Sequence, residues 1–377
     1  MIRENDFEDI RPYHDIEINA ALNRIIVNPA FDTILDTFFP NEDKSQLKAL
    51  LADTYTVRDF QVRFMYPLVY SIVGRTSDGL TSDGFENLTP GKSYLFVGNH
   101  RDIVLDSAIL QVLLLDHKHD TSEITFGSNL MSNQFIIDLG KVNRMFKVVR
   151  GYNKAELIRN SEILSAYIRH TVTVKGNSIW IAQRPGRTKD GCDKTEPGLL
   201  KMFNMSSRSN FTESFKELNI VPLVISYEYE PCCSLKIKEL LETAINGTYQ
   251  KKPGEDLMSI LTGINQPKGR IHMTVCKPLN FRESNPDKKD TLNSKINMLA
   301  QSIDREIFSH FKLWPNNYIA CDLLLESQQY REYYTPEDLQ GFLKYMESQT
   351  ENIEGNKATV RKLFLKIYAN PVLNARA

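Results

Sequence analysis

The sequence predicts an α/β fold, a mostly parallel sheet flanked by helices, with helical N-terminal and C-terminal extensions. Short apolar runs alternate with longer amphipathic segments in the middle of the chain, while both ends carry apolar residues at helical spacing. The 377 residues, 41% of them hydrophobic, suffice for one large core or for a core with an accessory domain. We expect a helical segment over 1–85, an α/β domain over 86–285 and a second helical segment over 286–377.

The N-terminal segment is predicted to be helical up to about residue 75. Within it, residues 60–73 are rich in aromatic side chains, with Arg58 and Arg63 interleaved. This mixture is typical of a helix at a membrane interface, but it also suits a helix buried against the sheet, so both interpretations stay open. The Ser-, Asp- and Gly-rich run 76–84 is predicted to be a linker.

Each strand of the predicted sheet is a short apolar run followed by a helical segment. We expect strands at 94–98, 124–127, 146–149, 178–182, 220–225 and 271–275. Helices are expected at 104–115, 133–139 and 155–167, and most of 291–369 is predicted to be helical. Strands that alternate with helices in this way need crossover connections, which makes neighbouring strands parallel.

Composition narrows the class of protein. With 46 Lys plus Arg against 47 Asp plus Glu, the net charge is -1, which does not suit a nucleic-acid binder. The five cysteines form no CxxC pair and predict reduced thiols. The acidic, polar start predicts no signal peptide, and no apolar run reaches the ~20 residues that span a bilayer. We therefore expect a cytoplasmic protein whose membrane contact, if any, is peripheral and on the inner face.

The segment Gly98–Asp106 carries the clearest chemistry. It lies where a predicted buried strand ends and a helix begins, the place at which open α/β sheets hold ligands. His100 there is suited to accept a proton near neutral pH, and a carboxylate nearby could orient its ring. The alternative is a structural histidine, with Asp102 as the N-cap of the helix.

This segment resembles the first block of the glycerolipid acyltransferase superfamily, which includes glycerol-3-phosphate and lysophosphatidate acyltransferases. The block is a histidine, four residues and an aspartate, often with arginine directly after the histidine. His100 and Arg101 fit it, whereas Leu105 stands at the place of the aspartate and Asp106 follows one residue later. The resemblance implies that His100 is the general base, with Asp106 as its favoured partner and Asp102 as the other candidate.

Three further stretches resemble later blocks of the family in the same order. Residues 146–151 match an apolar strand ending in Arg150, residues 184–189 match a loop after the next strand, and residues 220–225 match an apolar strand with proline. In the loop, Pro185 stands where the family has glutamate. The resemblance implies that the acceptor's anionic headgroup and the oxyanion are held by a set of cations and one glycine: Arg101, Arg150, Arg184, Gly186, Arg187 and Lys189.

The resemblance also implies the reaction. An acyl group would move from acyl-CoA or acyl carrier protein to the hydroxyl of a glycerol-phosphate or lysophospholipid, with no metal or cofactor. Two alternatives stay open: an acylated amino acid as the acceptor, and a non-catalytic lipid-binding protein on the same fold. A metal site at His117 and His119 is not expected, because residues two apart do not share a helix face. Cys232 and Cys233 have no histidine nearby in sequence, so a nucleophilic cysteine is not expected.

Overall fold

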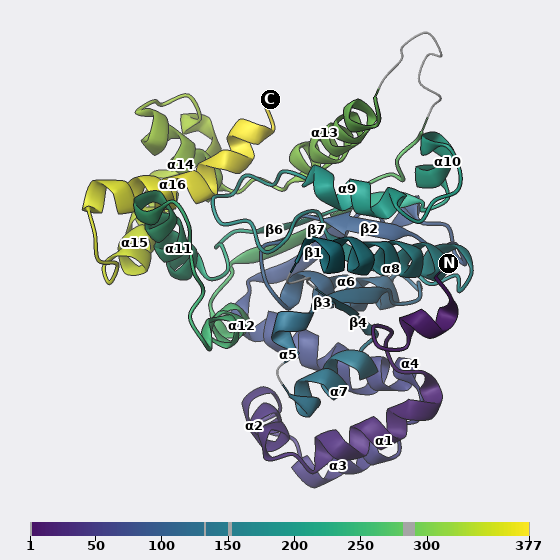
Figure 1. Ribbon diagram of the computed structural model, residues 1–377. Coiled ribbons are helices and arrows are strands. Elements are labelled where there is room, and N and C mark those ends of the chain that lie inside the picture. The colour runs from purple at the N-terminus through teal and green to yellow at the C-terminus, as the bar shows by residue number, and fades with distance from the viewer. Residues whose placement is uncertain (1, 132, 150–152, 282–290, 377) are drawn as a thin grey trace.

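The computed structural model describes the chain except residues 1, 132, 150–152, 282–290 and 377 (Figure 1). Seven strands of this described part form one sheet in the order β1-β7-β6-β2-β5-β3-β4. They are β1 (Gly79–Asp83), β2 (Leu95–Gly98), β3 (Glu123–Gly127), β4 (Met145–Val148), β5 (Ile179–Ala182), β6 (Ile220–Tyr227) and β7 (Arg270–Val275). All neighbouring strands are parallel except β6 and β7, which are antiparallel. The predicted α/β class with a mostly parallel sheet is confirmed.

One predicted linker is wrong. Residues 79–83 form the edge strand β1, which pairs in parallel with β7. Its side chains alternate between exposed and half-buried, so it has no apolar run by which the sequence could reveal it. The strand forms because β7 offers an unpaired edge, which is a tertiary constraint and not a local one.

Alternate side chains of the central strand enter two different cores. Phe96 packs in one core, whereas Leu95 and Val97 pack in the other, as the two faces of a strand require. The first core also receives α5 (Tyr66–Thr76) and α6 (Leu105–Asp116). The second receives α8 (Lys154–Thr173), α9 (Pro197–Asn204) and α13 (Leu292–His310). The sheet is therefore covered by helices on both faces.

The N-terminal helices lie on the first face of the sheet. They are α1 (Asp15–Ile26), α2 (Pro29–Phe38), α3 (Lys44–Ala52) and α4 (Val57–Phe60), and a short π-helix, Gln61–Met65, joins α4 to α5. Phe60 and Phe64 are each 1% exposed. Of the two interpretations of residues 60–73, the structure shows burial for the rings of Phe60 and Phe64, whereas Tyr66 and Tyr70 are half-buried.

A third core gathers helices from two parts of the chain. It contains α11 (Cys233–Asn246), α14 (Pro315–Leu325), α15 (Pro336–Thr350) and α16 (Lys357–Asn374), which Figure 1 shows together at one end of the sheet. The remaining helices are α7 (Gln134–Val142), α10 (Phe211–Lys216) and α12 (Glu255–Asn265). The helical C-terminal extension is confirmed, although α13, its first helix, packs on the sheet itself.

Candidate active site

His100 lies in the loop between β2 and α6, at the carboxyl edge of the central strand of the sheet. The neighbouring residue Asn99 fixes this loop to β6, because its side chain donates to the Ile225 carbonyl (3.0 Å) and accepts from the Ile225 N–H (2.8 Å). On the other side, the Thr188 N–H donates to the His100 carbonyl at 2.7 Å. The backbone that carries the imidazole is therefore held by both neighbouring segments.

The imidazole of His100 pairs with Asp106. His100 Nδ1 lies 2.9 Å from Asp106 Oδ2, and the His100 side chain is 13% exposed while that of Asp106 is 2% exposed. An ionised carboxylate only accepts hydrogen bonds, so a neutral His100 ring paired with it carries its proton on Nδ1 and keeps the lone pair of Nε2. The Trp180 ring packs edge-on against the imidazole, with ring centroids 5.6 Å apart. Such an imidazole is oriented and has a free basic nitrogen.

Asp106 is in turn held by three further donors. Its Oδ2 accepts from the N–H groups of Arg101 (2.6 Å) and Asp102 (2.9 Å), and its Oδ1 accepts from the Tyr227 hydroxyl (2.9 Å). Burial, together with the charge of Asp106, raises the pKa of Tyr227 well above its ordinary value, so this hydroxyl stays a donor. Nothing in the sequence singles out Tyr227, which lies two residues after the predicted strand 220–225.

Asp102, the other candidate partner, caps the helix. Its Oδ1 accepts from the N–H groups of Val104 (2.9 Å) and Leu105 (2.8 Å) at the start of α6. Its Oδ2 has no hydrogen-bond partner among the described groups. Burial and the nearby Asp106 carboxylate raise the pKa of Asp102. The structure thus brings Asp106, and not Asp102, to the His100 ring.

Arg101 lies in the interior and is not placed for a substrate. It is 1% exposed and forms ion pairs with Asp193 (2.5 Å) and Glu230 (2.9 Å). Lys236, which is 0% exposed, pairs with the same Glu230 and donates to the Arg101 carbonyl at 2.7 Å. This buried group joins the His100 loop to the segments after β5 and β6, so we leave Arg101 out of the substrate-binding set.

Three of the expected cations lie in the loop after β5, and their environments differ. Arg187 is 6% exposed, and its Nη1 has no hydrogen-bond partner in the described part of the chain. Lys189 is paired with Glu239, and burial lowers the pKa of Lys189 to about 8. Arg184 is half-buried and Gly186 is exposed, with the positive φ of +76° that favours glycine. Arg150 lies outside the described residues.

Arg187 is the cation best suited to bind an anion. A buried guanidinium nitrogen is normally satisfied, and one that lacks a protein partner is a ready donor to a phosphate or carboxylate. Its backbone neighbour Thr188 donates to the carbonyl of His100, so the loop that carries Arg187 borders the backbone of His100. The oriented imidazole and a guanidinium with one nitrogen unpartnered among the described residues therefore lie on adjacent loops.

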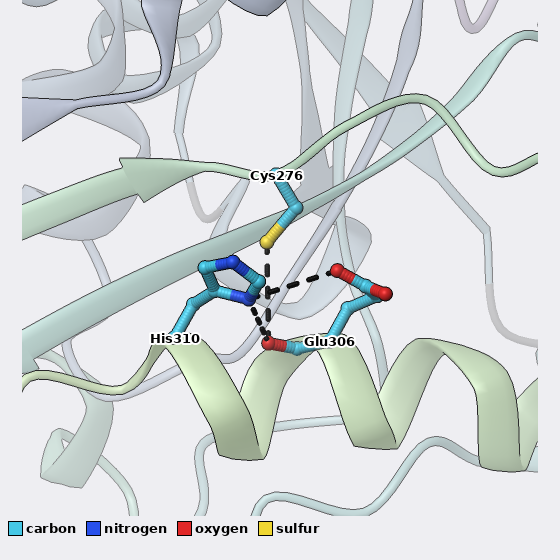
Figure 2. A group of neighbouring side chains, drawn as sticks. All are labelled: Cys276, Glu306 and His310. Atoms are coloured by element: carbon cyan, nitrogen blue, oxygen red, sulfur yellow. Dashed lines mark hydrogen bonds and ion pairs between the residues drawn. The ribbon is translucent and has the colours of Figure 1, made fainter.

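A group of potential metal ligands lies elsewhere in the described part of the chain. Cys276, Glu306 and His310 bring their donor atoms within 4.8 Å of one another at the end of α13 (Figure 2). His310 Nδ1 is 2.9 Å from the Glu306 carbonyl, and the Cys276 thiol also faces that carbonyl. Burial raises the pKa of Cys276, so its thiol stays protonated. The imidazole of His310 and the thiol of Cys276 therefore both have Glu306 as a hydrogen-bond partner.

The other groups set aside from sequence are His117 and the two adjacent cysteines, of which Cys232 lies near Arg187 and Asp102. The ring of His117 stacks on Phe85, with centroids 4.2 Å apart. Cys232 and Cys233 are both fully buried, and burial raises the pKa of each thiol. A protonated, buried thiol is a poor nucleophile.

Comparison with known proteins gives a distant structural likeness. No protein-family model matches the chain, and no curated protein sequence does. Among solved structures, the crystal structure of the 1-acyl-sn-glycerophosphate (LPA) acyltransferase PlsC from Thermotoga maritima is similar, with a TM-score of 0.37 and 10% sequence identity over 77% of this chain and 95% of that one. So distant a likeness carries no argument about chemistry.

None of the described helices combines the length and apolar character needed to cross a membrane.

Replacing Arg101 with Met should destabilise the protein severely. Asp193 would keep the neutral amide of Asn99 as a donor but lose its buried cation. Breaking such a buried pair costs about 3–5 kcal/mol of unfolding free energy, measurable by urea denaturation. The control is Arg58→Met, because the Arg58 and Asp120 side chains are 60% and 88% exposed; it should cost less than ~1 kcal/mol. Equal losses in the two variants would contradict a structural role for the buried group.

Proposed function

We propose that the chain is an O-acyltransferase. It moves a fatty acyl group from acyl-CoA or acyl carrier protein to the hydroxyl of a glycerol-phosphate or lysophospholipid acceptor. It works as a cytoplasmic protein that binds peripherally to the inner face of a membrane. The proposal unites the resemblance of the His100 segment to the glycerolipid acyltransferase superfamily with the geometry around that residue.

The pairing of His100 with Asp106 supports this proposal most directly. The family block has a histidine followed by a carboxylate partner, and in this sequence the carboxylate of Asp106 comes one residue later than in the family. In the structure, Asp106 nevertheless lies 2.9 Å from His100 Nδ1 at the carboxyl edge of the sheet. The adjacent loop, which carries Arg187, is bound to the backbone of His100 through the Thr188 N–H.

The proposed reaction is a direct transfer. His100 Nε2 accepts the proton of the acceptor hydroxyl as that oxygen attacks the carbonyl carbon of the acyl thioester. The tetrahedral intermediate then collapses, the carbon–sulfur bond breaks, and the imidazolium returns its proton to the leaving thiolate. Asp106 stays ionised and holds the ring throughout. Backbone N–H groups near Gly186 would stabilise the oxyanion. These steps form no acyl-enzyme and use no metal.

We assign the binding of the acceptor's headgroup to the loop after β5. Arg187 is the foremost group, with Arg184 beside it in sequence and Arg150 as a further contributor. A guanidinium binds phosphate and carboxylate alike, so the acylated amino acid remains an alternative acceptor. A lipid-binding protein without chemistry is the other alternative, and Pro185, which replaces the family's glutamate, is the observation that favours it.

His100→Ala should abolish transfer. Loss of the general base lowers turnover about 10²–10⁴-fold, while the thermal melt stays close to that of the unchanged protein. The measurement is release of free thiol from acyl-CoA and from acyl carrier protein. The acceptor panel contains glycerol-3-phosphate, lysophosphatidate and an acylated amino acid.

The matched control is His272→Ala. His272 is also a mostly buried histidine beside an aspartate, with its Nε2 3.3 Å from Asp83, but it lies on β7. It should retain turnover. Full activity in the His100 variant would reject the mechanism. Lipid binding with no thiol release from either donor would favour the non-catalytic alternative.

Arg187→Gln should weaken binding of anionic acceptors specifically. Loss of a charged hydrogen bond is worth roughly ten-fold, so we expect KM for a phosphate-bearing acceptor to rise about ten-fold. Turnover of a neutral acceptor such as monoacylglycerol should stay the same. The melting temperature is measured alongside, because the Arg187 charge also acts on the buried carboxyl group of Asp102. Equal effects on both acceptors would remove Arg187 from the headgroup site.

Tyr227→Phe should lower kcat about ten-fold with little change in KM, because Asp106 would lose a donor that orients it. Tyr94→Phe is the control: Tyr94 is 2% exposed, and its hydroxyl accepts from the Thr89 N–H at 2.7 Å without touching Asp106. Both variants should lose comparable stability, and Tyr94→Phe should keep its turnover. A similar fall in kcat for the two would show that Tyr227 acts through stability alone.

A further inference from the structure

We propose that Cys276, Glu306 and His310 form a binding site for a zinc ion, with a water molecule as the fourth ligand. The site goes beyond the proposed function, because no residue that we place in the acyl transfer contributes to it. Its cysteine also lies on the other face of the sheet: the Cys276 side chain enters the second core, whereas Trp180, which packs against the His100 ring, belongs to the first.

The three side chains come from the end of a strand and from the last turns of a helix (Figure 2). Cys276 directly follows β7, and its N–H donates to the Pro222 carbonyl at 3.0 Å, which fixes its backbone to β6. Glu306 and His310 lie four residues apart on α13, so their side chains share one face of the helix. One donor atom from each of the three residues lies within 4.8 Å of the other two. The fold therefore brings three potential ligands from distant parts of the chain to one point.

The kinds of donor atom indicate zinc. Thiolate sulfur, imidazole nitrogen and carboxylate oxygen are the ligand types that zinc takes in proteins, at about 2.0–2.3 Å. Calcium and magnesium take oxygen ligands, so a site with sulfur and nitrogen does not suit them. At these bond lengths the ligand atoms around a tetrahedral zinc ion lie roughly 3.5 Å apart. Donor atoms that already lie within 4.8 Å of one another therefore need to approach by little more than about 1 Å.

The contacts that these side chains make with one another can give way to an ion. Cys276 Sγ lies 4.0 Å from the Glu306 carbonyl, and a thiol is a weak donor. Glu306 Oε2 is 3.6 Å from His310 Nδ1, which is beyond hydrogen-bond distance. His310 Nδ1 also lies 2.9 Å from the Glu306 carbonyl, and this is the bond that a metal ion would replace. The His310 side chain is 43% exposed, so its ring has room to turn toward the ion.

The charges of the site match a divalent ion. Cys276 is 1% exposed, and zinc would displace the proton of its thiol to solvent on binding. The thiolate and the Glu306 carboxylate together neutralise Zn²⁺, as a buried sulfur ligand requires. Glu306 is half-buried and His310 is exposed, so the ion can reach the sulfur from the side of the helix. A bound ion would connect the end of β7 to α13.

The experiment measures zinc binding to the full chain after treatment with a chelator that is then removed by dialysis. Isothermal titration with zinc chloride should show one ion per chain. Cys276→Ser and His310→Ala should each weaken the affinity at least about ten-fold. Cys321→Ser and His14→Ala are the matched controls, because Cys321 is a second buried cysteine and His14 a second exposed histidine. Both controls should bind zinc as the unchanged protein does.

Two further readouts test the ligands themselves, and neither depends on acyl transfer. The protein loaded with Co²⁺ should show the charge-transfer absorption of a cobalt–thiolate bond, and Cys276→Ser should lose it. Zinc should raise the melting temperature of the unchanged protein but not that of His310→Ala, an exposed position whose variant should fold without the ion. Unchanged affinity in both ligand variants, or cobalt binding without thiolate absorption, would assign the ion to other surface side chains and overturn the site. A chain that binds no zinc would overturn it as well.

Discussion

The carboxylate of Asp106 is the constraint on which the site depends. It lies in the first turn of α6, buried, and takes hydrogen bonds from two backbone N–H groups, a tyrosine hydroxyl and the His100 ring. The two N–H groups belong to residues that precede it by four and five positions, so the chain must fold back on itself to supply them. A loop of this shape fixes the imidazole before any substrate arrives, and preorganised polar groups of this kind do not have to rearrange during a reaction.

A group of buried ion pairs holds the His100 loop in place. Arg101 follows His100 directly and is buried with Asp193 and Glu230, while Lys236 adds another cation to Glu230. The Glu230 N–H donates a hydrogen bond to the hydroxyl of Tyr368 on α16 at 2.9 Å. The interior ion pairs therefore connect the catalytic loop to the helices of the third core. Buried charges are costly to desolvate, and they stabilise a fold only when each is matched, as these are.

The sequence predicted those parts of the fold that apolar patterning encodes. Six strands lie close to their expected positions because each contains a short apolar run. β1 was missed because its residues are polar and it exists only as a partner of β7. For the site, the residue pattern found His100 and favoured Asp106, and the structure pairs them. It could not show that Arg101 turns inward, because a cation after a histidine looks the same whether it faces a substrate or a buried carboxylate. Tyr227 and Asp193 reach the loop from distant segments, and only the fold reveals them.

The antiparallel return of β7 beside β6 has a consequence for how such a protein can vary. The two strands pair side by side, so residues 228–269 leave the sheet and come back to the adjacent position at the same edge. Such an excursion is closed at its base by ladder hydrogen bonds, and lengthening it costs little chain entropy. Its tip can therefore diverge while the central parallel strands stay fixed, whereas Glu230, Lys236 and Gly263, which contact the His100 loop, are constrained.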